Sequence, residues 1–470
     1  MGKLYYRPKD AWFGDCMPFG QNGIFYLFHQ RDTRNPEPFG EPFGWSLSTT
    51  KDFVHYEDKG IVIPRGGDNE QDQFIYAGSV CEAEGKYHIF YTGYNRNYSA
   101  LNKPSQVLMH AVSDDLLNWK KTTDEITFTP QLGYDPDDWR DPWIIRDEAT
   151  NKYLLVLGAR KCGPKTRRSG RTVFFTSDDL QNWEFGGDFW APDLYTMHEM
   201  PDLFRMGDWW YHIITEYSSG HKMIYRMSRS LQGPWITPSD DAFDGSAYYA
   251  GRTFELDGRR ILFGWVPTKE NNDDRSNYEW GGDFVPHEIF QRSDGTLGAR
   301  VPETVWKIFK TRRQIQDCTI RADNGAERST VILANDCSGM YSFEADLIFS
   351  EGTRSFSVDL RYDSEGDESY RFDFSVKSNR YSFDRTPNWP WFNYQNIGLE
   401  RPLVLTPGET YHVRVIVDDD IATMYVNGVA LNARMYSKLG TSVAVSVIGG
   451  SVHVRNASIS REEDCVFTAE

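Results

Sequence analysis

The chain has 470 residues and a formal net charge of −17 at pH 7. A chain of this length is longer than those that typically fold around one hydrophobic core, so we expect two domains. The negative charge argues against nucleic acid as a partner, because association would begin with repulsion. No stretch approaches the roughly 18 apolar residues of a membrane helix, so we expect no membrane partner. The N-terminus lacks the apolar core of a signal peptide, which predicts a cytoplasmic protein, although secretion of a processed form stays open.

The cysteines and the aromatic residues further restrict the class of protein to which the chain can belong. Six cysteines lie far apart with no C-x-x-C spacing, which predicts free thiols and neither a zinc site nor a disulfide framework. The chain also contains 15 Trp, 26 Tyr and 29 Phe. Such residues are favoured in strands, and their flat rings suit clefts that bind sugars.

Two short patterns repeat along the first 300 residues. A strand-like run begins at Tyr26, Tyr87, Tyr153, Tyr211 and Ile261, with starts 61, 66, 58 and 50 residues apart. A polar turn followed by an aromatic residue recurs at 50–56, 113–119, 177–183 and 228–235, and its Ser and Asp side chains can bond their own backbone. Units of 50 to 65 residues with several strands predict a five-bladed β-propeller. A β-solenoid would need shorter and more uniform repeats.

The last third of the chain has a different pattern. Runs beginning at residues 342, 371, 411 and 443 alternate with period two, as half-buried strands do, and Asn427–Gly428 suits a tight hairpin. With no helical pattern between them, these strands predict a β-sandwich. We therefore expect an all-β protein with a propeller at 1–305 and a sandwich at 306–470. The aromatic run at 389–392 is interpreted as packing or an interface contact rather than a sugar-binding surface.

Three carboxylates and two tyrosines occupy one equivalent position in the five repeats. Each lies 11 or 12 residues before the strand-like run of its repeat: Asp15, Tyr76, Asp141, Glu199 and Tyr249. The innermost strands of a propeller line its central channel, so these side chains should meet in one funnel. Like charges brought together are costly, and such clusters are more often functional than structural.

Two facing carboxylates are what cleavage of a glycosidic bond requires, because one protonates the departing oxygen and the other attacks or stabilises the sugar cation. A third acid held by an arginine, as in Arg140–Asp141, can bind sugar hydroxyls. Two other interpretations remain open. Three carboxylates could ligate a divalent cation such as calcium, and the propeller could bind a sugar without cleaving it.

At these residues the sequence resembles glycoside hydrolase family 32, the β-fructofuranosidases. W-F-G-D ending at Asp15 is similar to the family's W-M-N-D-P-N-G, R-D-P at 140–142 to its R-D-P, and E-M-P-D-L-F at 199–204 to its E-C-P-D-L-F. Weaker similarities follow in family order, among them F-H-Q at 28–30, G-W at 44–45, A-G-S at 77–79, G-W at 264–265 and W-G-G-D-F-V-P at 280–286. The resemblance covers the propeller in full and the architecture of the tail.

The resemblance implies a role for each acid. Asp15 would be the nucleophile, Glu199 the general acid/base, and Asp141 with Arg140 would bind fructose hydroxyls and stabilise the transition state. The residues expected to contact the substrate are Trp12, Gln30, Trp45, Tyr76, Ser79, Arg140, Tyr249 and Trp265. No cofactor and no metal ion is expected.

The motif around Asp15 departs from the family. Gly14 replaces the family's Asn and Cys16 its Pro, while Met200 replaces the Cys after the acid/base. The missing side chain at Gly14 predicts that backbone amides approach Asp15 and stabilise its anion. Losing the Asn also leaves the preferred linkage undetermined.

The resemblance implies a retaining hydrolase that cleaves terminal β-D-fructofuranosides from sucrose, fructo-oligosaccharides or fructans through a covalent intermediate. The alternative enzyme is a related five-bladed glycosidase that acts on arabino- or xylo-oligosaccharides, and the alternative from another class is a carbohydrate-binding propeller without turnover. A small sugar or oligosaccharide containing fructose is the expected partner. The sequence does not determine chain-length preference, use of phosphorylated sugars or oligomeric state.

Overall fold

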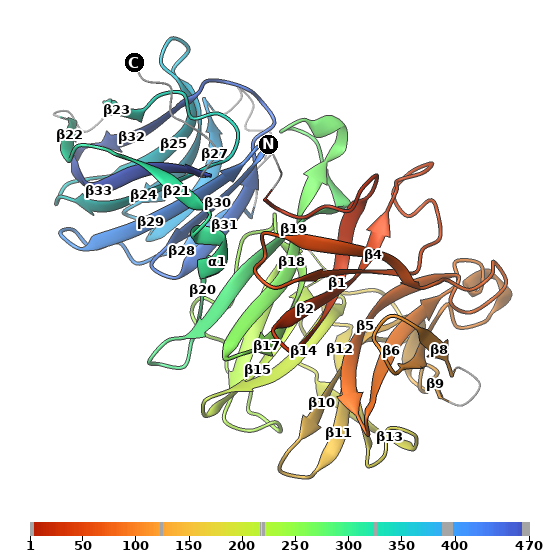
Figure 1. Ribbon diagram of the computed structural model, residues 1–470. Coiled ribbons are helices and arrows are strands. Elements are labelled where there is room, and N and C mark those ends of the chain that lie inside the picture. The colour runs from red at the N-terminus through yellow and green to blue at the C-terminus, as the bar shows by residue number, and fades with distance from the viewer. Residues whose placement is uncertain are drawn as a thin grey trace.

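The computed structural model describes residues 4–122, 126–216, 218, 221–322, 327–387 and 398–462. Its regular structure is almost entirely β, and it divides into two parts joined at one corner (Figure 1). The N-terminal part is a five-bladed propeller and the C-terminal part a β-sandwich. The predicted fold class is therefore confirmed.

The propeller blades follow one another along the chain, each built from antiparallel neighbours. The first blade contains β1 (Trp12–Gln21), β2 (Ile24–Asp32), β3 (Trp45–Thr50) and β4 (Tyr56–Ile63). The second contains β5 (Phe74–Ala83), β6 (Lys86–Tyr94), β7 (Gln106–Ser113), β8 (Trp119–Lys121) and the short β9 (Thr127–Phe128). The third contains β10 (Tyr134–Asp147), β11 (Lys152–Lys161), β12 (Gly170–Ser177) and β13 (Trp183–Trp190).

The last two blades close the ring. The fourth contains β14 (His198–Met206), β15 (Trp209–Glu216) and β16 (Met223–Ser228), and the fifth β17 (Tyr249–Leu256), β18 (Arg259–Lys269), β19 (Tyr278–Gln291) and β20 (Leu297–Arg300). Strand β19 pairs with β1 at Phe13 and Gly282, which joins the fifth blade to the first. This pairing covers edges that an open sheet would expose. Two single-turn 3₁₀ helices, Ser99–Leu101 and Glu270–Asn272, lie in connections between strands.

Both repeated sequence patterns have the predicted structural roles. The five strand-like runs are the second strands β2, β6, β11, β15 and β18. In the polar turns before β8 and β13, Asp115 and Asp179 each accept hydrogen bonds from two backbone amides that follow them. The aromatic residues that begin these strands, Trp119 and Trp183, donate back to Leu116 and Leu180. Each turn therefore fixes where the outer strand starts.

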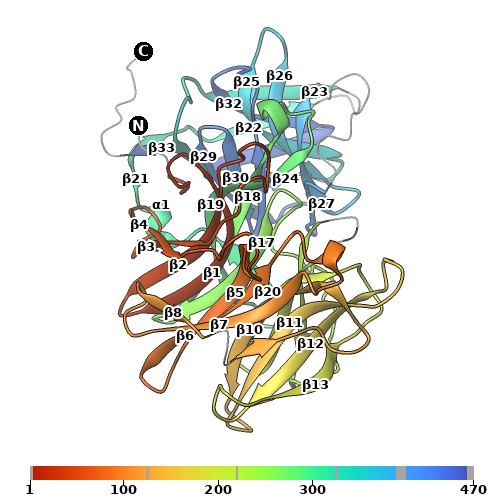
Figure 2. The ribbon, with the colours of Figure 1, turned by 90° about the vertical axis from the view of Figure 1, so that its right-hand side faces the viewer.

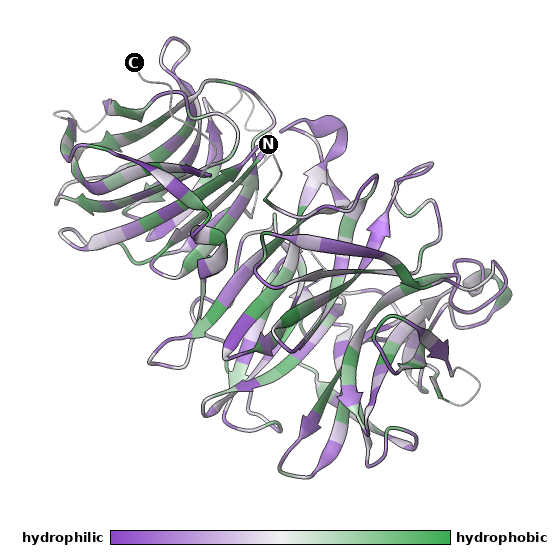
Figure 3. Ribbon diagram, in the orientation of Figure 1, coloured by the Kyte–Doolittle hydropathy of each residue, from purple (hydrophilic) through white to green (hydrophobic). Residues whose placement is uncertain are grey.

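The sandwich consists of two antiparallel sheets that follow a short helix, α1 (Glu303–Trp306). One has the order β21 (Phe309–Gln314), β33 (Gly450–Glu462), β24 (Tyr341–Phe349), β29 (Thr410–Asp418), β30 (Ile421–Val426) and β31 (Val429–Arg434), with β22 (Cys318–Ala322) also on β33. The other has the order β23 (Arg328–Ala334), β32 (Ser442–Ile448), β25 (Ser355–Asp363), β26 (Glu368–Ser375), β27 (Arg380–Thr386) and β28 (Glu400–Pro402). Figure 3 shows hydrophobic and hydrophilic residues alternating along these strands.

The sandwich packs directly against the propeller, and Figure 2 shows the two parts in contact from the side. Sandwich residues Ile421 and Tyr425 belong to the same buried hydrophobic cluster as the first and last blades. In the same interface Asp244 accepts hydrogen bonds from the backbone amide and the side-chain amide of Asn432, at 2.8 and 2.6 Å. His287 lies between Asp244 and Tyr425, at 3.0 and 2.8 Å. Buried polar groups paired in this way fix the relative orientation of the two parts.

The remaining sequence predictions have mixed outcomes. Asn427 and Gly428 have positive φ values of 46° and 80°, as the predicted hairpin between β30 and β31 requires. Cys16, Cys81, Cys162, Cys318 and Cys337 are free thiols, while Cys465 and the aromatic run at 389–392 lie outside the described residues. Among the helices that the structure describes, none is long and apolar enough to cross a bilayer. The division of the chain at 305/306 stays a prediction.

Candidate active site

The five equivalent side chains all lie on the first strand of a blade, at an irregularity of that strand. The pairing of β1 with β2 shifts between Phe13 and Cys16, on either side of Asp15. Corresponding shifts begin at Tyr76, Arg140, Glu199 and Tyr249 in the other four blades. A β-bulge turns a side chain out of the regular alternation and is common beside active sites. The repeated bulges therefore direct one side chain from every blade toward the propeller axis.

These side chains meet in a cavity of about 390 Å³. It is lined by Asp15, Gln30, Phe39, Tyr76, Gln106, Asp138, Arg140, Asp141, Lys165, Glu199, Met200, Tyr249 and Trp280. The volume suits a sugar unit of a larger substrate. The lining combines four carboxylates, two cations and four aromatic rings, which is the combination that sugar recognition requires.

Glu199 is anchored through both carboxylate oxygens. Arg140 donates from Nη2 to Oε1 at 2.6 Å, and Tyr249 donates from Oη to Oε2 at 2.5 Å. The Glu199 side chain is 16% exposed and lines the cavity. Charge-assisted hydrogen bonds of this length hold a side chain in one geometry.

Asp141 is almost fully buried beside the same arginine. The Nε of Arg140 lies 3.8 Å from Asp141 Oδ2, which also accepts a hydrogen bond from the Met200 amide at 3.1 Å. The backbone at Asp141 has a positive φ of 63°, a strained conformation for a non-glycine residue and one that is frequent at functional sites. Arg252, fully buried, donates to the Asp141 carbonyl at 2.7 Å and so supports this backbone.

Asp15 accepts a hydrogen bond from Trp265 Nε1 at 3.2 Å. The prediction that backbone amides fill the space beside Gly14 is wrong, because the indole of Trp280 occupies it. A Cβ atom at residue 14 would lie 2.1 Å from Cη2 of that ring. The missing side chain therefore admits an aromatic ring to the cavity wall rather than polar groups to the carboxylate.

The electrostatics of Asp15 follow from this environment. Burial raises its pKa from 3.8 to about 8, with further contributions from the negative charges of Asp141 and Glu199. Burial also raises the pKa of Asp141, although Arg140 opposes the effect. The ionised Asp15 that the sequence predicted is thus disfavoured at neutral pH by burial and by the neighbouring negative charges. Carboxylates that share a low-dielectric site cannot all ionise together.

Seven predicted site residues line the cavity together: Asp15, Gln30, Tyr76, Arg140, Asp141, Glu199 and Tyr249. The other four lie outside its lining. Trp45 is fully buried and donates to the Tyr76 carbonyl at 3.0 Å, and Trp265 is buried against Asp15. Ser79 is 1% exposed, and Trp12 stacks against the Arg34 guanidinium at 4.1 Å. The two large indoles Trp45 and Trp265 pack between blades and position groups that do line the cavity.

Sequence reasoning did not assign Phe39, Gln106, Asp138, Lys165 or Trp280 to the site. Asp138 lies two residues before Arg140, and the period of a strand could have indicated that both face one side. Trp280 stands in a family-like motif but was given no role. Phe39 lies between β2 and β3 and Lys165 between β11 and β12, so no strand period indicates where their side chains point.

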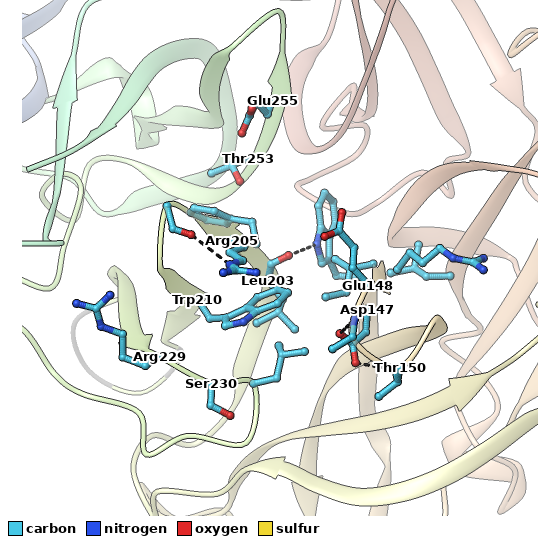
Figure 4. A pocket seen from close by; sticks show the side chains of 18 of the residues that line it. Asp147, Glu148, Thr150, Leu203, Arg205, Trp210, Arg229, Ser230, Thr253 and Glu255 are labelled. Atoms are coloured by element: carbon cyan, nitrogen blue, oxygen red, sulfur yellow. Dashed lines mark hydrogen bonds between the residues drawn. The ribbon is translucent and has the colours of Figure 1, made fainter.

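A larger cavity of about 780 Å³ lies at the other end of β10 and β14 (Figure 4). Its lining includes Trp210, Arg205, Asp147 and Glu255. Asp147 lies six strand positions after Asp141, which is about 20 Å along β10. Asp147 bonds the turn residues Ala149 and Thr150, and Glu255 binds Arg260. The three acids at equivalent positions of the blades line the smaller cavity and not this one, so we assign the chemistry to the smaller cavity. Among the described residues no cluster of three or more His, Cys, Asp or Glu is arranged to hold a metal ion.

Comparison with known proteins identifies the family. The model of the glycosyl hydrolases family 32 N-terminal domain matches residues 5–294, and that of the family's C-terminal region matches 307–461. The chain belongs to glycosyl hydrolases family 32. Among family relatives, it is 22% identical over 463 residues to a sucrose-6-phosphate hydrolase of Escherichia coli, covering 92% of this chain and 88% of the relative. It is 25% identical over 390 residues to a levanbiose-producing levanase of Bacillus subtilis, covering 74% and 68%.

Solved structures of family 32 share the fold along almost the whole chain. Sucrose-6-phosphate hydrolase from Lactobacillus gasseri superposes with a TM-score of 0.77 at 19% identity, covering 98% of this chain and 93% of that one. Fructan 1-exohydrolase IIa from Cichorium intybus, in a variant complexed with 1-kestose, superposes with a TM-score of 0.79 at 16% identity, covering 99% and 98%. At these identities the likeness supports the fold, and the roles of individual residues depend on the site geometry.

Proposed function

We propose that this family 32 glycoside hydrolase removes terminal β-D-fructofuranosyl units with retention, through a covalent intermediate on Asp15. The observation that carries the proposal is the pair of carboxyl groups in one cavity, with Glu199 anchored by Arg140 and Tyr249 and Asp15 buried beside aromatic rings. The activities named for the relatives, on sucrose 6-phosphate and levan, support the same reaction class.

In the first step Asp15 attacks the anomeric carbon of fructose while Glu199 gives its proton to the departing oxygen. The bond from carbon to that oxygen breaks with its electron pair, and an ester to Asp15 forms. The reactive state needs one proton shared by the two carboxyl groups to reside on Glu199. Neutralising Glu199 removes one of the charges that raise the pKa of Asp15, and so favours the ionised nucleophile.

In the second step Glu199 acts as a base. Its carboxylate takes a proton from water, the hydroxide attacks the anomeric carbon, and Asp15 leaves with the electron pair of the ester bond. Two displacements at one carbon restore the original configuration. The anchoring of Glu199 at both oxygens keeps the same group in place for both steps.

Arg140 and Asp141 bind and orient the sugar. Arg140 contacts Glu199, Asp138 and Asp141 at once, so its position couples the acid/base to the hydroxyl-binding side of the cavity. Asp141 supplies negative charge near the positive charge that develops on the sugar ring in the transition state. Phe39, Tyr76 and Trp280 provide flat apolar surface for the ring.

A substrate panel tests the proposal. The purified chain is incubated with sucrose, inulin, levan, arabinan and xylo-oligosaccharides, and the released sugars are separated by chromatography. We expect fructose from at least one of the first three and no arabinose or xylose. Release of arabinose or xylose alone would support the related glycosidase, and binding without any release would support a carbohydrate-binding protein.

A further inference from the structure

Arg252 is a fully buried arginine on β17 that has no carboxylate partner. Among the described residues no carboxylate oxygen lies within 4.0 Å of its guanidinium nitrogens, and its Nε is buried without a hydrogen-bond partner. Most other buried arginines of the chain pair with an acid, namely Arg140, Arg160, Arg171, Arg226, Arg401 and Arg434. A buried charge without a partner is costly, so the surroundings of Arg252 must compensate it.

The guanidinium of Arg252 joins the β-bulges of three blades. Arg252 itself ends the bulge that begins at Tyr249 in the fifth blade. Its Nη1 donates to the carbonyl of Gly78, at the bulge of the second blade, and to that of Pro142 at 3.2 Å. Its Nη2 donates to the carbonyl of Asp141 at 2.7 Å, at the bulge of the third blade. A bulge disrupts the ladder locally, and Arg252 provides donors at two of these disruptions.

These contacts determine where the Asp141 carboxyl group points. Arg252 binds two successive carbonyls, those of Asp141 and Pro142, and so holds the backbone on the C-terminal side of Asp141. The φ of 63° at Asp141 is a strained conformation that persists only where its surroundings enforce it. Without the guanidinium this backbone could relax and turn the carboxyl group away from the cavity.

Arg252 also acts on the acids through its charge. Burial raises the pKa of Asp15 and of Asp141, and the positive charge of Arg252 opposes this effect on both. Burial in turn lowers the pKa of Arg252 to about 10, against the attraction of the nearby carboxylates. The guanidinium therefore remains charged at neutral pH.

The number of charges in the site matches one proton on the three acids. Under the proposed function, Asp15 and Asp141 are ionised in the reactive state and Glu199 carries a proton. Two negative charges then face two positive ones, Arg140 and Arg252. If Arg252 were neutral, one negative charge would be uncompensated in a buried site, and Asp15 would bind a second proton.

The other ionisable groups around this cluster do not replace Arg252. Burial raises the pKa values of the Cys16 thiol and of the Tyr76 and Tyr249 phenols, so these groups stay neutral at pH 7. The remaining charged groups have cations of their own: Asp138 binds Arg160 and Lys165, and Asp202 lies in the field of Arg260.

We propose that Arg252 is a positioning residue of the reaction, which holds the bulge that carries Asp141 and supplies the second positive charge that balances the carboxylates of Asp15 and Asp141. The inference rests on the proposed function of the cavity. Arg252 does not line the cavity, so it acts through these two acids and not on the substrate.

The test compares Arg252→Gln, which removes the charge, with Arg252→Lys, which keeps the charge but has fewer donors. Arg361→Gln is the matched control, because Arg361 is 7% exposed and likewise donates to three carbonyls, those of Met435, Ser437 and Asp419 in the sandwich. We measure kcat/KM for an activated aryl fructoside across pH. The thermal unfolding midpoint shows whether each variant is folded.

We expect the acidic limb to move to higher pH by about one unit or more in Arg252→Gln, because loss of a nearby positive charge makes Asp15 harder to ionise. In Arg252→Lys the limb should stay in place, while kcat/KM falls about tenfold at every pH because Asp141 is less well held. Arg361→Gln should have the wild-type profile.

An unmoved limb in a folded Arg252→Gln variant would overturn the charge role. If that variant does not fold, Arg252→Lys decides, and either a moved limb or an unchanged kcat/KM in it would overturn the proposal. Failure of wild type to cleave any fructoside would instead overturn the proposed function.

A second measurement does not depend on activity. Asp15→Asn is introduced into wild type and into Arg252→Gln, and the gain in unfolding temperature at pH 9 is compared. We expect a larger gain in Arg252→Gln, since an ionised Asp15 costs more without the cation. Equal gains would show that Arg252 and Asp15 do not interact and would overturn the charge role.

Discussion

Trp280 lies against Gly14 so closely that the two positions form one unit. A Cβ at residue 14 would fall 2.1 Å from the Trp280 ring, closer than any real contact. The ring also contacts Phe39 at 4.5 Å and Trp265 at 5.7 Å between centroids, and Trp265 bonds the Asp15 carboxylate. The size of residue 14 therefore determines where the Trp280 ring can lie, and through Trp265 it affects the position of the Asp15 carboxylate.

Gly14→Ala should lower kcat/KM by about tenfold or more. The new Cβ displaces Trp280, and this disturbs Trp265, which donates a hydrogen bond to Asp15. The double variant Gly14→Ala/Trp280→Ala should lose less than the sum of the two single effects. Gly67→Ala is the control, since a Cβ there makes ordinary contacts. Additive losses in the double variant would show that the two residues act independently.

The raised pKa of Asp15 predicts a pH-dependent stability. The folded chain holds this proton up to about pH 8, whereas the unfolded chain releases it near pH 3.8. The stability that the protonated carboxyl contributes is full below pH 3.8 and is lost as pH rises through about 8. Asp15→Asn, which cannot ionise, should therefore unfold about 2 °C or more above wild type at pH 9, with the difference closing near pH 4.

Asp115 provides a control with the opposite sign. Hydrogen bonds from Asn118 lower the pKa of this exposed carboxyl from 3.8 to about 2. Asp115→Asn should therefore be less stable than wild type above pH 4, and the difference should vanish as pH falls through about 2. Scanning calorimetry across pH measures both variants. If the unfolding temperatures of wild type and Asp15→Asn change in parallel with pH, the buried environment assigned to Asp15 is contradicted.

The pH dependence of the rate should report the coupling between the two carboxyl groups. With an activated aryl fructoside, which needs little acid assistance, the acidic limb of kcat/KM belongs to ionisation of Asp15. Glu199→Gln removes one of the negative charges that raise that pKa, so the limb should move to lower pH. A limb that stays in place would show that Asp15 and Glu199 do not interact, and a limb that moves to higher pH would contradict repulsion between them.

Tyr249→Phe tests the anchoring of Glu199. The change removes the 2.5 Å hydrogen bond from Tyr249 to Oε2 and leaves the Arg140 contact in place. Glu199 must keep one position as acid and then as base, and misplacing a catalytic group is costly, so kcat on sucrose should fall about 10- to 100-fold. The loss should be smaller on the aryl fructoside. Equal losses on both substrates would assign the tyrosine to sugar binding instead.

Much of this arrangement could be predicted because a propeller repeats. The fixed spacing of 11 or 12 residues placed Asp15, Asp141 and Glu199 on equivalent strands, and symmetry then placed them on one axis. The repeat could not indicate which side chains lie behind the cavity, so Trp45 and Trp265 were expected in direct contact with sugar. Nor could it predict what fills the space beside Gly14, because Trp280 is distant in sequence and arrives from the last blade.

The most direct test of the proposed mechanism is capture of the covalent intermediate. Glu199→Gln is mixed with an activated aryl fructoside, quenched with acid, digested with protease and analysed by mass spectrometry. Glycosylation proceeds because the leaving group needs no proton, while deglycosylation is slow without the base. We predict that one fructosyl unit is attached to the peptide containing Asp15 and that none is attached in Asp15→Asn/Glu199→Gln. Turnover without a labelled peptide, or a label on another residue, would contradict the assignment of Asp15 as the nucleophile.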